Sequence, residues 1–158
     1  MGSGKSAVGR ILARELGRPY VDVDSEVERR AKKPVALIFK ENGESAFRRL
    51  ERREIALISR RAGMVVALGG GALLDQANKE LILKGICVRL TCAEPQLWRR
   101  LQAEISARPL LAGGRKALRA LLRGRKNAYL GAHFSVSTTR RSPIEAARRI
   151  IRRLKETA

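Results

Sequence analysis

The chain opens with Met1-Gly2-Ser3-Gly4-Lys5-Ser6, and this stretch decides how the remainder is interpreted. Gly-x-Gly-Lys-Ser is the greater part of a phosphate-binding loop. In such a loop the glycines let backbone N–H groups face a polyphosphate, the lysine neutralises its outer phosphates, and the serine hydroxyl can bind Mg²⁺. A helix that follows directs its positive end at the same anion. The stretch predicts a nucleotide site, with a chance cluster or a leftover tag as the alternative.

The motif is incomplete at its start. The full pattern, G-x-x-x-x-G-K-[ST], would begin two residues before Met1, and the strand that leads into it would lie further upstream. We therefore expect a nucleotide site that lacks its first strand and its first loop glycine.

Composition favours one globular domain. Hydrophobic residues make up 44% of the 158 residues and charged residues 31%. A run of about 18 apolar residues, which a membrane helix needs, is absent. Cys87 and Cys92 have no metal-ligand spacing and are expected to be reduced, which is typical of a cytoplasmic protein. His133 is the only histidine, so the sequence excludes a metal site built from several histidines.

The net charge of +19 allows two interpretations, because 34 Lys and Arg face 15 Asp and Glu. A basic surface can bind nucleic acid through phosphates. Alternatively, the excess reflects anionic small substrates and solvated arginines. Aromatic residues make up only 4%, and they do not interleave with basic residues as a base-stacking surface requires. Nucleic-acid binding is therefore the less favoured interpretation, although substrate binding does not explain the whole excess.

Apolar runs and helical stripes alternate along the chain. Strands are expected at residues 19–24, 64–68, 86–90 and 134–137, and helices at 6–16, from 25, from 34 to 39, at 44–61, 75–84, 95–103, 117–130 and from 142. Strands that alternate with helices predict an α/β fold with a parallel sheet covered on both faces. Ligands of such folds bind beyond the carboxyl ends of the strands.

Asp22 and Asp24 lie at such a carboxyl end. They are two residues apart on the expected strand, so their side chains should leave the same face. One carboxylate can bind a hard cation together with Ser6, and the other can accept a hydroxyl proton. The alternative is that one of them only caps the next helix, for which Ser25 and Glu28 have capping-box spacing.

Gly69-Gly70-Gly71 follows a strand expected to be buried. Three glycines are useful where a ligand approaches the backbone closely, and a plain tight turn is the alternative.

Three arginines are candidates for binding anions. Arg125 falls on the apolar stripe of its expected helix, where a charge is costly unless it meets an anion such as a carboxylate, or reaches solvent. Arg48, beside Phe47, is a similar and weaker case. Arg108 lies in the irregular stretch 105–116, where a cation can fold over a nucleotide.

In order along the chain, these features resemble the shikimate kinase family. The shared landmarks are the Gly-Ser-Gly-Lys-Ser loop with Gly9-Arg10, Asp22-x-Asp24, Ile38-Phe39-x-x-x-Gly43-Glu44-x-x-Phe47-Arg48-x-x-Glu51, Gly69-Gly70-Gly71-Ala72, Arg108-Pro109-Leu110-Leu111, and Arg125 four residues before Tyr129.

The resemblance implies a three-layer P-loop kinase fold of the nucleoside-monophosphate-kinase type. Its five-stranded parallel sheet has the order 2-3-1-4-5, and the strand absent here is the central one. Residues 1–158 would form a single domain, with a lid at about 103–116 and shikimate-binding helices at about 25–61. The expected form is a cytoplasmic monomer.

The resemblance also implies an activity and a role for each matching residue. ATP would phosphorylate the 3-hydroxyl of shikimate, a step toward chorismate and aromatic amino acids. Asp24 would be the base, with Lys5 and Arg108 assisting the transfer. ATP would contact Gly2, Ser3, Gly4, Lys5, Ser6, Ala7, Arg100, Arg108, Arg141 and Pro143. Mg²⁺ would lie near Ser6 and Asp22, and shikimate would contact Asp24, Arg48, Gly69, Gly70, Gly71 and Arg125.

Two other interpretations remain open at this point. The chain could be a truncated, inactive or ligand-sensing domain of the same fold. Asp24, Arg48 and Arg125 weigh against this, because a sensor of another ligand need not keep the residues that grip shikimate. A basic nucleic-acid-binding protein is the third possibility.

Overall fold

The computed structural model describes residues 2–107 and 109–157 of the chain. The helices are α1 (Lys5–Glu15), α2 (Val23–Ala31), α3 (Val35–Ile58), α4 (Gln76–Ile82), α5 (Glu94–Leu101), α6 (Gly114–Gly124) and α7 (Pro143–Thr157). Short 3₁₀ segments are η1 (Ala72–Leu74), η2 (Gln102–Ala107), η3 (Pro109–Leu111) and η4 (Ala128–Gly131). The strands are β1 (Tyr20–Asp22), β2 (Val65–Ala67), β3 (Val88–Thr91) and β4 (Phe134–Ser137).

The strands pair in parallel, as the alternating pattern predicts. Val21 of β1 lies opposite Val66 of β2, and Leu90 of β3 lies opposite Val136 of β4. Within the described ranges these are two separate two-stranded sheets, β1-β2 and β3-β4. The α/β class with a parallel arrangement flanked by helices is confirmed, and both pairs are neighbours in the expected order.

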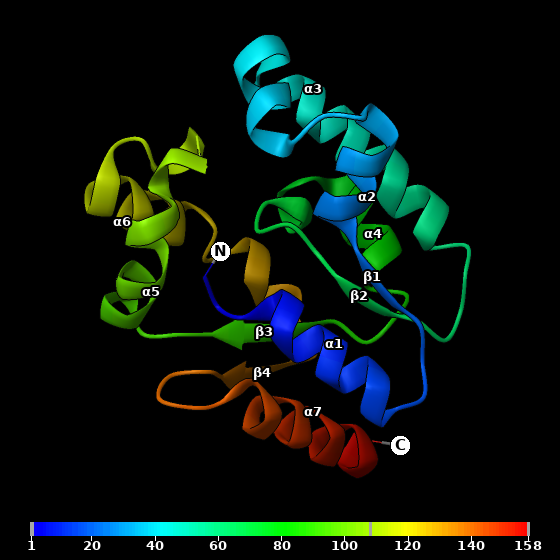
Figure 1. Cartoon of the computed structure of the whole chain (residues 1–158). Helices are drawn as coiled ribbons and strands as arrows, with labels where there is room; N and C mark the ends of the chain where they lie inside the picture. Colours follow the sequence, from blue (N-terminus) through cyan, green and yellow to red (C-terminus); the bar gives the residue numbers. More distant parts are fainter. Residues whose placement is uncertain (1, 108, 158) are drawn as a thin grey trace.

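Helices cover both sides of the strands (Figure 1). On one side α1 and α7 pack together, and Leu12 and Ile150 form a buried cluster with Val136 of β4. On the other side Ile55 of α3 packs with Val23 and Ala72. α5, α6 and η3 form a separate group at the left of Figure 1, with Leu97, Leu101, Leu111 and Leu118 in its core.

The start of α2 differs from the prediction. The strand ends at Asp22, whose backbone is extended and whose carboxylate accepts a hydrogen bond from the Asp24 backbone N–H at 3.2 Å. Asp22 is therefore the N-cap, and Asp24 lies in the first turn of α2. The expected capping box of Ser25 and Glu28 is wrong, because Glu28 instead accepts from the Val35 backbone N–H at 2.8 Å.

Two other expected helix boundaries move. The helices expected on either side of Asn42-Gly43 run on as α3, in which Gly43 has non-helical angles (φ 76°, ψ 173°) and marks a kink. The helix expected over residues 117–130 instead begins at Gly114 and ends at Gly124, a residue with low helix propensity. Arg125 is its C-cap, and a 3₁₀ turn follows.

The stretch 105–116, expected to be an irregular loop, is partly ordered into 3₁₀ turns. Pro109–Leu111 forms η3, and its Leu111 side chain is completely buried against the α5–α6 group. This anchor explains why α6 can begin earlier than predicted.

Candidate active site

The phosphate-binding loop runs through residues 2–6 into the N-terminus of α1. Gly4 has a left-handed backbone (φ 85°), and its carbonyl accepts the first hydrogen bond of the helix from Val8 at 2.9 Å. Gly2 is also left-handed (φ 66°), and a Cβ there would lie 2.9 Å from Cγ of Leu101. Both glycines are therefore required by the local geometry, and the loop leaves the first N–H groups of α1 free for an anion.

A cavity of about 560 Å³ opens over this loop. Among the residues that line it are Gly2, Ser3, Gly4, Lys5, Ser6, Ala7, Asp22, Asp24, Arg100, Arg141 and Pro143. The structure thus gathers the predicted nucleotide and metal residues around one space, together with Asp24. Arg108 lies outside the described residues.

Three side chains that line this cavity donate hydrogen bonds to main-chain carbonyl groups. Arg100 donates to the carbonyl of Gly2 at 3.2 Å, and Arg141 donates to that of Ser137 at 3.2 Å. The buried Thr138 hydroxyl donates to the carbonyl of Ser3 at 3.1 Å. Thr138 was not identified from the sequence, because a lone threonine after a strand carries no distinctive pattern. These bonds tie the loop to the carboxyl ends of β3 and β4.

Ser6 and Asp22 meet as predicted. The Ser6 hydroxyl donates to Oδ2 of Asp22 at 2.8 Å, and the Tyr20 hydroxyl donates to the same oxygen at 3.1 Å. A hydroxyl and a carboxylate are oxygen ligands of the kind that Mg²⁺ prefers, with water and phosphate oxygens completing its coordination. The described residues contain no group of three or more His, Cys, Asp or Glu arranged to hold a metal. The pair therefore fits Mg²⁺ that arrives with a polyphosphate.

Asp24 carries an unsatisfied oxygen. Its Oδ1 is buried and has no hydrogen-bond partner among the described residues. Burial, followed by the negative charge of Asp22, raises the pKa of Asp24, and the charges of Lys5 and Arg48 act against this rise. A carboxylate in this state accepts a proton more readily than an ordinary aspartate does.

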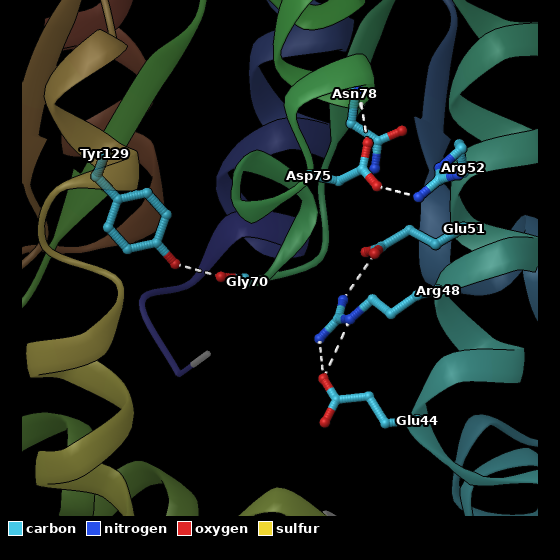
Figure 2. A network of polar contacts seen from close by, with 8 residues as sticks. All are labelled: Glu44, Arg48, Glu51, Arg52, Gly70, Asp75, Asn78 and Tyr129. Atoms are coloured by element: carbon cyan, nitrogen blue, oxygen red, sulfur yellow. Dashed lines mark hydrogen bonds and ion pairs between the residues drawn. The ribbon is translucent and has the colours of Figure 1, made fainter.

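Arg48 of α3 is held between two carboxylates (Figure 2). It donates to Glu44 at 2.9 Å and to the fully buried Glu51 at 2.6 Å. Burial raises the pKa of Glu51, against which the charge of Arg48 and, more weakly, that of Arg125 act. No role for Glu51 was predicted, although its spacing three residues after Arg48 on a helix is the signal that pairs them.

The glycines after β2 give close access to these groups. A Cβ at Gly69 would clash with Oε1 of Glu51 and lie 2.9 Å from Oδ1 of Asp24. A Cβ at Gly71 would lie 2.5 Å from the Arg48 guanidinium. The Tyr129 hydroxyl donates to the Gly70 carbonyl at 2.5 Å (Figure 2). The glycines therefore exist where charged side chains crowd the backbone, which argues against a plain tight turn.

Arg125 is buried as its place on the apolar stripe predicted, with 7% of its surface exposed. Its Nε has no hydrogen-bond partner among the described residues. The guanidinium therefore does not escape to solvent, and a buried cation with an unpartnered donor favours an anionic ligand.

The family model for shikimate kinase matches residues 1–155. The shikimate kinase of Symbiobacterium thermophilum is 42% identical over 163 residues, spanning 99% of this chain and 92% of the relative. That of Thermobifida fusca is 43% identical over 155 residues, spanning 97% and 90%.

Solved structures give the same result. Shikimate kinase from Acinetobacter baumannii in complex with shikimate superposes with a TM-score of 0.95 and 33% identity, over 99% of this chain and 89% of that one. The enzyme from Bacteroides thetaiotaomicron gives a TM-score of 0.87 at 30% identity, over 98% and 94%. With its P-loop kinase fold and near-complete coverage of its relatives, the chain belongs to the shikimate kinase family, whose members are transferases that use ATP and Mg²⁺.

Proposed function

We propose that this protein transfers the terminal phosphoryl group of ATP to the 3-hydroxyl of shikimate, a step of chorismate and aromatic amino acid biosynthesis. One observation carries the proposal. The cavity over the phosphate-binding loop also reaches Asp24, whose unpartnered Oδ1 would lie 2.9 Å from a Cβ at Gly69, the first glycine of the acceptor side.

The nucleotide would bind along the loop. Backbone N–H groups at the start of α1 and the Lys5 ammonium neutralise the phosphates, while Gly2, Ser3, Gly4, Ser6 and Ala7 shape the cradle. Arg100, Arg141 and Pro143 line the outer part of the cavity and would contact the adenine. When bound, Mg²⁺ at Ser6 and Asp22 would neutralise charge on the phosphates.

The acceptor would bind on the other side of Asp24. Arg48 and Arg125 would bind the shikimate carboxylate, and Gly69, Gly70 and Gly71 would let its ring approach the backbone. The hydroxyl would donate its hydrogen bond to Asp24 Oδ1. The proton would pass to Asp24 as the new P–O bond forms and as the bond between the terminal phosphorus of ATP and its bridging oxygen breaks, which releases ADP. The raised pKa of Asp24 supports this role as base.

Arg108 completes the proposal from the sequence. It matches the arginine of the family that closes over the phosphates, within a lid at about residues 103–116. We assign it to stabilisation of the transferring charge, within a single domain that spans residues 1–158. We also propose a monomer that acts in the cytoplasm. Within the described residues, no helix is both long and apolar enough to cross a membrane.

The test is ADP release from Mg-ATP, measured with and without shikimate. We expect ADP release that depends on both shikimate and Mg²⁺. Phosphorus–proton NMR of the product should show that the phosphate is bonded to O3. Arg123→Met, on an exposed last turn of α6, is the control and should retain full activity. Shikimate binding without any turnover would instead identify an inactive or sensing domain, and binding of arbitrary duplex DNA without turnover would identify a nucleic-acid-binding protein.

A further inference from the structure

The three glycines that follow β2 are held in two different ways. The carbonyls of Gly69 and Gly71 accept hydrogen bonds from backbone N–H groups of the turn that comes next, at 3.2 and 3.0 Å. The carbonyl of Gly70 between them instead accepts from the Tyr129 hydroxyl at 2.5 Å. The central peptide of this short loop is therefore held by a side chain that lies 59 residues away in the sequence.

A glycine backbone needs such a restraint more than other backbones do. Glycine has no Cβ, so it has access to a wide range of φ and ψ angles and loses more conformational entropy when it is fixed. The peptide between Gly70 and Gly71 has a glycine on each side, so little else opposes its rotation. The Tyr129 hydroxyl therefore restrains the peptide that has the most freedom to turn.

The direction of this peptide matters for the acceptor side. Tyr129 approaches Gly70 from one side, and Arg48 and Glu51 lie on the other (Figure 2). The peptide bonds of the described residues are trans, and the C=O and N–H of a trans peptide point in opposite directions. The N–H of Gly71 therefore points to the side of Arg48 and Glu51. Among the described residues it donates no backbone hydrogen bond, which leaves it available to a ligand.

The ring of Tyr129 is itself held from β3. Val88 and Leu90 pack in the cluster that α1 and α7 form, so Arg89 between them leaves from the opposite face of the strand. The central carbon of its guanidinium lies 5.2 Å from the centre of the Tyr129 ring. A cation over an aromatic face is attracted by the electrons of the ring. Arg89 therefore helps to hold the ring where its hydroxyl reaches Gly70.

Tyr129 also anchors the segment that carries Arg125. Its backbone N–H donates to the Arg125 carbonyl at 3.3 Å. The turn to which it belongs, η4, contains no buried residue, and the neighbouring Leu130 is 71% exposed. The half-buried Tyr129 side chain is thus an anchor of a turn that is otherwise poorly buried. One hydroxyl therefore links the segment after Arg125 with the glycines beside Arg48.

We propose that Tyr129 is a positioning residue for the acceptor: its hydroxyl, with Arg89 over the ring, sets the peptide between Gly70 and Gly71 so that the N–H of Gly71 faces the acceptor beside Arg48. The role rests on the proposed function, because that function supplies the acceptor. The hydroxyl acts on the glycine backbone and not on residues 2–6. The role therefore predicts a loss of acceptor affinity without a matching loss of ATP affinity or of kcat.

The first test needs no ligand. When glycine alone is labelled, with ¹³C at its carbonyl and ¹⁵N at its amide, an HNCO spectrum shows only glycine pairs, at residues 69–70, 70–71 and 113–114. In Tyr129→Phe, which keeps the ring, the carbonyl carbon of Gly70 should move to lower frequency because it loses a hydrogen bond. The signal of the 113–114 pair is the internal reference and should stay in place. An unchanged Gly70 carbon would overturn the proposal.

The second test measures shikimate affinity by calorimetry and turnover by ADP release. The loss of one neutral hydrogen bond in Tyr129→Phe should raise the Kd for shikimate about 3–10-fold and leave kcat and the Kd for ATP within about twofold. Tyr20→Phe is the matched control, since it deletes the other tyrosine hydroxyl, which donates to Asp22. That change should leave the Gly70 carbon and the Kd for shikimate unchanged. A Gly70 carbon that moves while shikimate affinity stays the same would overturn the role.

A double-mutant cycle tests the part played by Arg89. Arg89→Met removes the charge over the ring and should weaken shikimate binding about 2–5-fold. In a Tyr129→Leu background, where the ring is gone, the same change should have no further effect. An equal effect in both backgrounds would show that Arg89 acts by another route, and it would remove Arg89 from the proposal.

These outcomes separate the role of Tyr129 from the proposed function. A wild-type chain that does not bind shikimate would overturn both. If the wild-type chain binds and phosphorylates shikimate, and Tyr129→Phe binds it equally well, the role alone is overturned and the proposed function stands.

Discussion

The proposed nucleotide side and the proposed acceptor side meet at Asp24, and they differ in how the chain forms them. The nucleotide side is one contiguous loop, residues 2–6, whose shape is held by main-chain hydrogen bonds to Arg100 and Thr138. The acceptor side consists of side chains from separate elements, α2, α3 and the end of α6, around the glycines that follow β2. On the nucleotide side the backbone of one loop forms the centre of the proposed binding surface, and side chains such as Lys5 add to it. On the acceptor side the side chains form the centre, and the backbone of residues 69–71 adds to it.

This difference also appears in which groups lack partners. Buried polar atoms without a hydrogen bond include Asp24 Oδ1, Glu51 Oε1 and Arg125 Nε, all on the acceptor side. Each such atom lowers stability by about 1–3 kcal/mol relative to a satisfied one. The acceptor side is thus the less stable arrangement by itself, and it has the most to gain from a ligand.

The largest effect is expected from a change at Asp24, which should alter turnover and leave ATP binding intact. Asp24→Asn removes the proposed base while it keeps the shape of the side chain, so we expect kcat to fall by about 10²–10⁴-fold. ATP affinity, measured by calorimetry, should stay within about twofold because the backbone loop is untouched. A matched Glu28→Gln change, which lines the same cavity, should leave kcat nearly unchanged. Loss of ATP binding in Asp24→Asn would contradict the base assignment.

A smaller effect is expected at Arg125. Arg125→Met removes a charged hydrogen-bond donor, which is worth about 1.5–3 kcal/mol, so KM for shikimate should rise by about 10–10²-fold while KM for ATP is unaffected. The matched Arg123→Met change lies two residues earlier on the exposed face. Steady-state kinetics with each substrate varied in turn would show the contrast, and equal effects of the two variants would remove Arg125 from the acceptor side.

A steric change at Gly69 should also affect the binding of shikimate more than the binding of ATP. Gly69→Ala places a methyl group against Glu51 and 2.9 Å from Asp24 Oδ1, so the charged groups must shift. We expect about tenfold weaker shikimate binding and little change for ATP. Gly85→Ala, whose Cβ would meet its nearest neighbour at 3.8 Å, is the control. Unchanged shikimate binding in Gly69→Ala would show that this backbone does not contact the ligand.

The smallest effect concerns the pH dependence of stability. The pKa values of Asp24 and Glu51 are raised on folding, chiefly by burial, so the folded protein holds these protons more tightly than the unfolded chain does. Their contribution to stability is present below the ordinary carboxyl pKa and is lost as pH rises through the raised values. Asp24→Asn should flatten this loss in denaturant unfolding curves measured over a pH series.

Asp75 is a control, because its pKa is shifted in the opposite direction from those of Asp24 and Glu51. The Asn78 backbone N–H, assisted by Arg52, lowers the pKa of Asp75. Its contribution is therefore present above the ordinary carboxyl pKa and is lost as pH falls through the lowered value. Asp75→Asn should remove the loss of stability at acid pH. It should leave unchanged the loss of stability that Asp24 and Glu51 cause as pH rises.

The sequence could place the proposed nucleotide side in one stretch because its residues are neighbours in the chain. Spacing alone placed Gly4, Lys5 and Ser6 at a phosphate site, and Ser6 does meet Asp22. The acceptor side was reached through the resemblance, and through scattered physical clues such as the carboxylate of Asp24, the three glycines after a buried strand and the place of Arg125 on an apolar stripe. Even there the expected continuous helix was wrong, because the chain leaves α6 after Gly124.

The remaining differences arise from competition between side chains for the same backbone groups. Both Asp22 and Ser25 have cap chemistry, and only the fold determines that β1 ends at Asp22 and leaves that carboxylate beside the Asp24 N–H. Thr138 and Tyr129 contact Ser3 and Gly70, residues more than fifty positions away. Such contacts have no local pattern in the sequence.

The two salt bridges of Arg48 have a consequence for how tightly the proposed acceptor and product would be bound. Glu44 and Glu51 accept from three of the five N–H groups of this guanidinium, so an incoming carboxylate would bind a cation whose charge is already compensated. Such a carboxylate would gain less free energy than it would at a bare guanidinium, and it would leave more readily. Arg125, whose Nε is buried and has no hydrogen-bond partner among the described residues, would gain more from the same ligand and would contribute more to its recognition.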